Sequence, residues 1–93
     1  MYKRQLEEIA RFIARDNPEA AIAWGDKLVD RAQEAAQHPM AGRVVPEIRD
    51  PKIREVLLKG YRIIYRVEPK RIVVLTITEG HRKLRLLSGG KRR

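Results

Sequence analysis

The sequence predicts an α+β domain in which an N-terminal helical hairpin packs on a small antiparallel β-sheet. Two observations support this prediction. In the first half of the chain apolar residues recur at helical spacing, and in the second half Val, Ile, Thr and Tyr gather in short runs between turn residues. With 93 residues the chain is long enough for one modest core and for no second domain. We therefore expect residues 1–87 to form a single domain and residues 88–93 a basic, disordered tail.

The first helix is expected from Tyr2 to about Arg15. Its apolar residues follow the i, i+3, i+4, i+7 spacing of one helix face: Leu6, Ile9, Ala10 and Ile13. Asn17 then suits the N-cap of a second helix and Pro18 its first position. The sequence therefore predicts a helix boundary at these two residues.

The second helix is expected from Pro18 to about Gln37. Its apolar side is broad and built mostly from small residues, with Trp24 as the large anchor against the first helix. The stripe comprises Ala21, Trp24, Leu28, Ala32 and Ala35, joined by Ile22, Val29 and Ala36. Small residues permit close approach, so the two helices are expected to pack as an antiparallel hairpin.

Three strands are expected to form an antiparallel meander after the turn at Asp50-Pro51: Ile53–Leu58, Tyr61–Glu68 and Ile72–Glu79. The preceding segment, residues 43–48, is extended but contains Pro46, so it is either a linker or a sheet edge. Neither face of the last strand is polar, which is typical of a central strand covered by other elements.

The strand Tyr61–Glu68 is expected to have one apolar face and one partly cationic face. Alternate side chains point to opposite sides of a strand. Tyr61, Ile63, Tyr65 and Val67 therefore share one side, and Arg62, Ile64, Arg66 and Glu68 share the other. We expect the first side to face the core, and the second is the best candidate for binding or chemistry.

The net charge of +9 is concentrated in the strand-rich half of the chain. Residues 1–47 hold seven Lys/Arg and eight Asp/Glu, giving −1, whereas residues 48–93 hold fourteen and four, giving +10. Such an excess favours a polyanion or an acidic protein as partner. The chain lacks cysteine, and no apolar run approaches the roughly 20 residues of a membrane span. We expect a cytoplasmic protein that does not contact a membrane.

The sequence lacks a phosphate-binding glycine loop, paired zinc-binding histidines and a credible serine nucleophile. We therefore expect neither a metal nor a cofactor. A set of cations remains as the candidate binding site: Lys52, Arg54, Arg62, Arg66, Arg82, Lys83 and Arg85.

Such a cationic set can act in two ways. Guanidinium groups could hold the scissile phosphate in an RNA cleavage step, or they could bind an acidic protein or a nucleic-acid backbone. His81 could transfer a proton, although a lone histidine at a strand end is more often structural. Glu55 and Glu79 could each act as a base or form cross-strand ion pairs with arginine.

Several segments together resemble toxins of the RelE/ParE superfamily, the toxic half of type II toxin–antitoxin modules. They follow a consistent order from about Leu6 to Leu87: LEEIARFIARDNPEAAIAW, P-x-x-G-R at Pro39–Arg43, IREV at Ile53–Val56, YRIIYRV at Tyr61–Val67 and VLTITEGHR at Val74–Arg82. The resemblance implies a helical hairpin on an antiparallel sheet, a concave basic face, and neutralisation by an acidic, largely extended antitoxin. It also implies that Arg62 and Arg82 correspond to two arginines of the family.

The chain departs from this family pattern in two respects. Family members usually begin with a β-strand, whereas here the helical pattern starts almost at Met1. An unpaired sheet edge would favour homo-oligomers or addition of an antitoxin strand. In addition, no tyrosine follows Arg82, and Gly60-Tyr61 precede Arg62 where some ribosome-dependent nucleases carry a carboxylate. The YRIIYR segment is closer to the ParE branch, whose members are known as gyrase poisons.

Three functional hypotheses follow. The first is a ParE-like toxin that binds a target, implied to be DNA gyrase, through its basic sheet. The second is an mRNA interferase, an endoribonuclease in which Arg62 and Arg82 hold the phosphate and His81 transfers a proton. The third is a degenerate, non-toxic member that only binds its partner.

Overall fold

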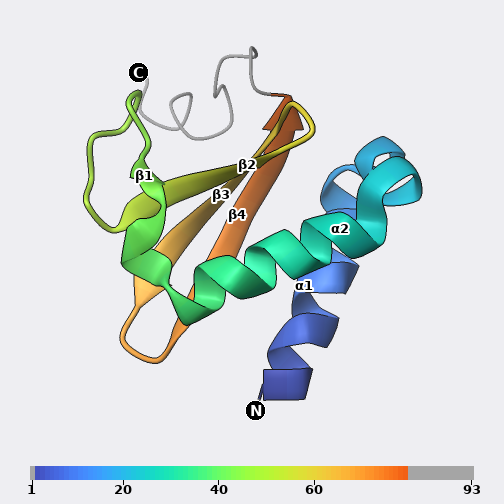
Figure 1. The fold of residues 1–93 in the computed structure, drawn as a ribbon, viewed down its shortest axis with the longest axis horizontal. Coiled ribbons are helices and arrows are strands. Elements are labelled where there is room, and N and C mark those ends of the chain that lie inside the picture. The colour runs from blue at the N-terminus through green and yellow to red at the C-terminus, as the bar shows by residue number, and fades with distance from the viewer. Residues whose placement is uncertain (1, 80–93) are drawn as a thin grey trace.

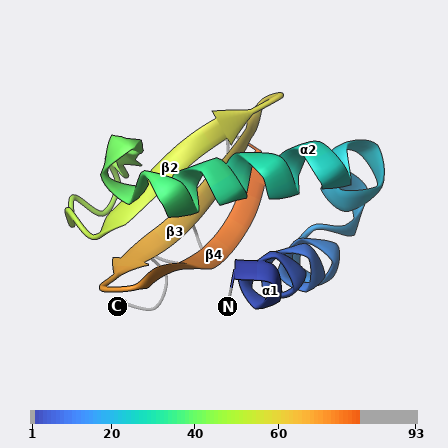
Figure 2. The same ribbon diagram turned by 60° about the horizontal axis from the view of Figure 1, so that its bottom comes forward.

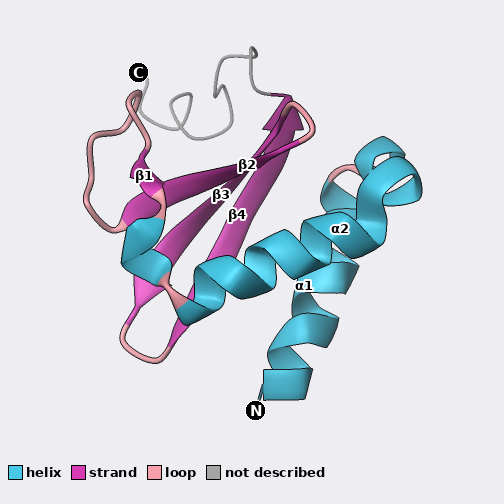
Figure 3. Cartoon of the chain, in the orientation of Figure 1, coloured by secondary structure: helices cyan, strands magenta, loops and turns pink. Residues whose placement is uncertain are grey.

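The computed structural model describes residues 2–79, with side chains from residue 7 onward. Two helices precede a four-stranded antiparallel sheet with strand order β1-β2-β3-β4 (Figures 1 and 3). The elements are α1 (Tyr2–Asp16), α2 (Pro18–Gln37), the 3₁₀ turn η1 (Pro39–Ala41), β1 (Arg43–Val44), β2 (Ile53–Leu58), β3 (Tyr61–Glu68) and β4 (Arg71–Glu79). The predicted α+β architecture is confirmed. The predicted tail, residues 88–93, lies outside the described residues.

The boundary between α1 and α2 lies where the sequence predicts it. The Asn17 side chain accepts a hydrogen bond from the backbone N–H of Ala20 at 3.1 Å, and Pro18 opens α2. This arrangement satisfies one of the N–H groups that a helix start leaves without an internal partner. The chain can therefore reverse direction within one residue and bring α2 back against α1.

Helix α2 is kinked at Trp24, whose φ of −138° and ψ of 22° are not helical. The following residue, Gly25, weakens the helix at this point. Ile22, just before the kink, is 87% exposed, although Ala20 in the first turn is fully buried. The expectation that Ile22 belongs to the packed arc is therefore wrong. Trp24 is half-buried against the core, and the Lys59 ammonium lies 5.0 Å from its ring centroid.

The helices cover one face of the sheet, which we call the inner face (Figure 2). Ile63 and Tyr65 of β3 point to this face and are fully buried together with Leu28 of α2 and Ile13 of α1. The alternation predicted for β3 is therefore confirmed on its apolar side. The opposite side of the sheet is the outer face.

Strand β4 lies at the edge of the sheet, so the expectation of a central strand is wrong. Ile64 pairs with Thr76 and Tyr65 with Val74, which leaves Leu75 as a bulge. Leu75 packs on the outer face against Ile64, and this contact explains why β4 is apolar on both sides.

The free edge of β4, on the side away from β3, is capped by the connection between the helices. The Asp16 carboxylate accepts hydrogen bonds from the Ile77 backbone N–H at 2.8 Å and from the Thr76 hydroxyl at 3.1 Å. The Asn17 side-chain amide donates to the Ile77 carbonyl at 3.2 Å. These contacts occupy backbone groups with which another strand could pair.

The other edge is formed by β1, so part of the segment that could be a linker or an edge is an edge strand. The chain then turns across the outer face as residues 45–52, which we call the covering loop. Val45 donates to the Ile53 carbonyl at 3.1 Å, and Arg49 donates to the Val45 carbonyl at 2.8 Å. Val45 of this loop and Ile64 of β3 are fully buried together and form a second, smaller core.

None of the helices in the described part of the chain is long and apolar enough to cross a membrane.

Candidate functional site

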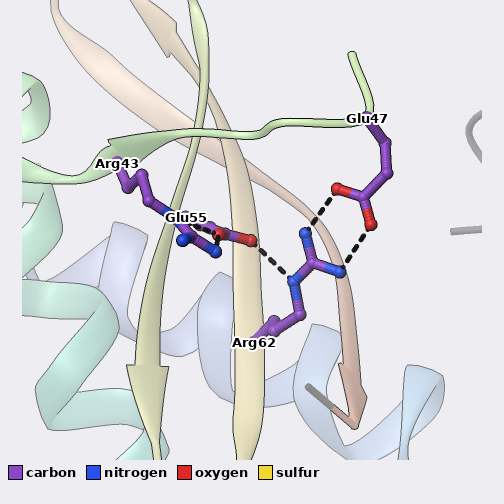
Figure 4. A network of polar contacts seen from close by, with 4 residues as sticks. All are labelled: Arg43, Glu47, Glu55 and Arg62. Atoms are coloured by element: carbon purple, nitrogen blue, oxygen red, sulfur yellow. Dashed lines mark hydrogen bonds and ion pairs between the residues drawn. The ribbon is translucent and has the colours of Figure 1, made fainter. Parts of the chain in front are cut away.

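Arg62 lies at the centre of a polar network on the outer face (Figure 4). It is only 4% exposed, and it pairs with Leu57 of the neighbouring strand. Its Nε atom donates to Glu55 at 2.6 Å, while Nη1 and Nη2 donate to the two carboxylate oxygens of Glu47 at 3.0 Å and 2.8 Å. This two-pronged contact is the strongest geometry that a guanidinium offers to a carboxylate.

Glu55 joins Arg62 to a second arginine. The Nε atom of Arg43 donates to Glu55 at 2.7 Å, and its Nη2 atom contacts the same oxygen. The Glu55 side chain is 1% exposed, whereas that of Arg43 is 64% exposed. Two guanidiniums and two carboxylates thus alternate from Arg43 to Glu47, and their formal charges cancel.

The network shifts the ionisation of its members. The hydrogen bonds from Arg62 hold the pKa of Glu47 below its ordinary value, although partial burial acts in the opposite direction. The hydrogen bond with Glu47 also raises the pKa of Arg62, against the effect of its burial. Both groups are therefore charged at neutral pH, and the contact between them is an ion pair.

The strand register explains why Glu55 meets Arg62. Glu55 pairs directly with Ile64, two residues along β3 from Arg62, so the two charged residues are diagonal neighbours on one face. Glu55 also pairs directly with Arg43 of β1. Of the two roles considered for Glu55, the structure shows the cross-strand ion pair.

Arg54 does not join this network, because it points to the other side of the sheet. It pairs with Tyr65, which faces the helices. Its guanidinium donates to three backbone carbonyls, those of Pro51 at 2.8 Å, Met40 at 3.1 Å and Gly42 at 2.8 Å. The expectation that Arg54 and Arg62 act in one cationic cluster is therefore not met in this structure, and Arg54 holds the chain around η1 against β2.

The segment around η1 is packed tightly against β3. The Tyr65 hydroxyl donates to the Pro39 carbonyl at 2.7 Å. A Cβ atom on Gly42 would lie 2.2 Å from the Tyr65 hydroxyl oxygen and 2.9 Å from the Glu55 carbonyl oxygen. Only glycine fits here, and this close approach sets the path by which the chain enters β1.

Arg66 lies near the opposite end of the outer face. Arg66 is on the same side of β3 as Arg62, roughly 13 Å along the strand, and donates to Glu68 at 2.9 Å. Lys52 is exposed at the end of the covering loop, immediately before β2. The remaining predicted site residues, His81, Arg82, Lys83 and Arg85, lie outside the described residues.

Two members of the network, Arg43 and Glu47, were not predicted as site residues. Arg43 ends the P-x-x-G-R segment, but no charge pattern in the sequence relates it to Glu55. Glu47 lies in the covering loop, where no strand or helix periodicity indicates the direction of a side chain. Their roles follow from the path of the chain across the outer face.

The network is closed by internal hydrogen bonds, and it lacks the properties of a proton-transfer site. Glu55 receives hydrogen bonds from two arginines, so both of its oxygens are engaged. An external anion can reach the terminal nitrogens of Arg62 only where Glu47 now lies. Within residues 2–79, no three His, Asp or Glu side chains lie close enough together to hold a metal ion.

Comparison with known proteins identifies one family. The sequence model described as "ParE toxin of type II toxin-antitoxin system, parDE" matches residues 2–84. This range includes both helices, the whole sheet and all four members of the Arg62 network. No curated protein matches the chain significantly.

Proposed function

Because the chain belongs to the ParE toxin family of type II toxin–antitoxin systems, we propose that it inhibits growth by binding a target through the outer face of its sheet. The target that we propose is DNA gyrase, and we propose that an acidic antitoxin neutralises the toxin. The family match over residues 2–84 is the observation that carries this proposal. Binding of both partners would take place in the cytoplasm.

The geometry of the network supports binding over RNA cleavage. In an mRNA interferase Arg62 would have to contact a phosphate while a neighbouring group transferred a proton. Nη1 and Nη2 of Arg62 contact Glu47, so a phosphate and a carboxylate would both have to displace that side chain, and proton transfer is the requirement that separates the two functions. Both carboxylate oxygens of the adjacent Glu55 accept hydrogen bonds from arginines, so neither is free to contact a substrate hydroxyl. The nuclease hypothesis therefore depends on His81 and Arg82, which lie beyond the described residues.

The proposed binding surface combines the outer face with the cations that follow β4. Arg66 is exposed on the outer face, and Lys52 is exposed at the end of the covering loop. Arg62 would contribute through the network, and Arg82, Lys83 and Arg85 would extend the surface along the chain. Clusters of arginine and lysine attract acidic partners over several ångströms and accelerate their association.

Two assays on the purified protein test the proposal, together with growth after induced expression. We expect growth arrest, inhibition of gyrase supercoiling, and no codon-dependent cuts in mRNA on translating ribosomes. Arg66→Gln should weaken gyrase inhibition because it removes an exposed cation from the outer face. Arg11→Gln, which removes an exposed cation from α1, is the matched control and should retain full inhibition.

The other hypotheses predict different results. Codon-dependent cuts that disappear in Arg82→Ala would establish the mRNA interferase and exclude the binding toxin. No arrest, no supercoiling defect and no cuts would identify a non-toxic member that only binds its partner.

A further inference from the structure

We propose that the terminal edge of the Arg62 guanidinium is a binding site for a carboxylate of an acidic peptide, and that Glu47 occupies this site in the free protein. The inference names the chemistry of a partner for the proposed binding surface, and its biological role rests on that proposed function. The site itself can be tested without any measurement of toxicity.

The position of Arg62 makes its terminal edge the accessible part. Its Nε side is anchored in the interior by Glu55, which is 1% exposed. Its Nη1 and Nη2 atoms point instead toward Glu47 (Figure 4). The Glu47 side chain is 38% exposed. A half-exposed carboxylate on a surface loop exchanges its protein partner for water more readily than a buried one. An external carboxylate could therefore take its place.

The exchange requires rotation of one side chain and no unfolding of the covering loop. The backbone of this loop is held by hydrogen bonds from Val45 to Ile53 and from Arg49 to Val45. The Val45 side chain is also fully buried against Ile64. None of these contacts involves the Glu47 carboxylate, so they persist when it rotates toward solvent. The site is therefore preorganised beneath a movable group.

The charges favour a single carboxylate as the incoming group. Without Glu47, the arginines Arg43 and Arg62 face one carboxylate, that of Glu55, which leaves one positive charge. A carboxylate restores neutrality and reproduces the two hydrogen bonds of Glu47. A doubly charged phosphate would instead bring an excess negative charge close to Glu55. Since the leaving and arriving groups are alike, the exchange creates no new desolvation cost at Arg62.

The neighbouring surface favours a peptide over a nucleic-acid backbone. Leu57 lies directly opposite Arg62 on the outer face and is 55% exposed. An exposed leucine offers no contact to a phosphodiester, but it can pack against an aliphatic side chain of a peptide. We therefore expect a partner segment in which a Glu or Asp is close to an aliphatic residue.

The test uses a short fluorescein-labelled peptide of alternating glutamate and leucine, titrated with the full-length protein and followed by fluorescence anisotropy. Glu47→Gln removes the competing carboxylate, and we expect it to tighten binding by about tenfold. The matched control is Glu34→Gln on α2, which causes the same change in charge and also disrupts an arginine–glutamate pair. It lies away from the outer face and should leave the affinity nearly unchanged.

Two further binding measurements identify the ligand. A peptide with glutamine in place of glutamate should bind Glu47→Gln no more tightly than the unmodified protein. Leu57→Ser should weaken binding of the glutamate–leucine peptide. If Glu47→Gln and Glu34→Gln increased the affinity for the peptide equally, the increase would reflect net charge alone and would overturn the inference. If Glu47→Gln bound single-stranded RNA more tightly but not the peptide, the inference would also be overturned, in favour of a nucleic-acid site.

Carbon-13 NMR of the Glu47 carboxylate provides a direct readout in the unmodified protein. A saturating amount of the peptide should return the pKa of Glu47 toward its ordinary value, because the group loses its hydrogen bonds to Arg62. A pKa that stays lowered while the peptide is bound would show that Glu47 is not displaced, which would overturn the inference.

Discussion

The Nε atom of Arg62 donates to Oε1 of Glu55 across 2.6 Å, and both side chains lie beneath the surface of the outer face. Two opposite charges removed from water stabilise a fold only as long as both are present. This relationship makes Arg62 a structural residue as well as a candidate binding residue. Loss of function in an Arg62 variant therefore has to be separated from loss of folding.

Arg62→Met should lower the free energy of unfolding by about 3 kcal/mol, because Glu55 stays buried with only the exposed Arg43 as a partner. The double variant Glu55→Leu/Arg62→Met should recover most of this loss, since it removes the buried charge together with its partner. Urea titrations of the three proteins provide the comparison. A double variant as unstable as Arg62→Met would argue against an uncompensated Glu55 as the cause.

Gly42→Ala should destabilise the protein by about 2 kcal/mol through overpacking. The added Cβ atom would lie 2.2 Å from the Tyr65 hydroxyl oxygen. Tyr65→Phe should reduce the cost of this substitution, because it removes the closest atom. Gly25→Ala is the control: its Cβ atom meets nothing within 4 Å, so stability should stay equal or rise. Thermal unfolding of Gly42→Ala, Tyr65→Phe, their double variant and Gly25→Ala tests whether residues 42 and 65 are coupled. A double variant whose loss of stability equals the sum of the two single losses would contradict this coupling.

Acid should remove the contribution of Glu47 to stability. The folded-state pKa of Glu47 is lowered from 4.5, so its ionised form stabilises the fold above that pH. The contribution disappears as pH falls through the lowered pKa. Solvent screens this partly exposed ion pair, so Glu47→Gln should cost only about 1 kcal/mol at neutral pH and almost nothing in strong acid. Urea titrations at both pH values measure the difference, and a loss that is independent of pH would be inconsistent with the ion pair.

Asp16→Ala should uncover the edge of β4. The Ile77 backbone N–H loses its acceptor, which should cost about 1–2 kcal/mol, and the edge becomes available to another strand. We expect a concentration-dependent increase in self-association by analytical ultracentrifugation. Asp30→Ala, an exposed aspartate on α2, should leave self-association unchanged. If Asp16→Ala behaves like this control, the carboxylate does not protect the edge.

The long elements of this fold can be predicted because each carries its own local signal. Asn17 and Pro18 mark the start of α2, and the alternation in residues 61–68 indicates which side of β3 is buried. The position of β4 at the sheet edge could not be predicted in this way. Its apolar outer side comes from the bulge at Leu75 and from packing under the covering loop, both of which depend on tertiary contacts.

The residues of the candidate site also differ in whether the sequence alone predicts them. Strand periodicity places Arg62 on the side of β3 that also carries Arg66 and Glu68, opposite the apolar side. Its partner Glu47 cannot be placed in this way, since the direction of a loop side chain depends on how the chain crosses the sheet. Arg54 looks equivalent to Arg62 in the sequence, and only the strand register places it on the opposite face.

The contact between Lys59 and Trp24 gives the protein an intrinsic optical reporter. Trp24 is the only tryptophan in the chain and lies at the kink of α2, while Lys59 is at the tip of the β2–β3 hairpin. A nearby ammonium alters the emission of an indole ring, so separation of hairpin and helix changes the intrinsic fluorescence. Rapid-mixing experiments can therefore follow the docking of sheet and helix in the unlabelled protein.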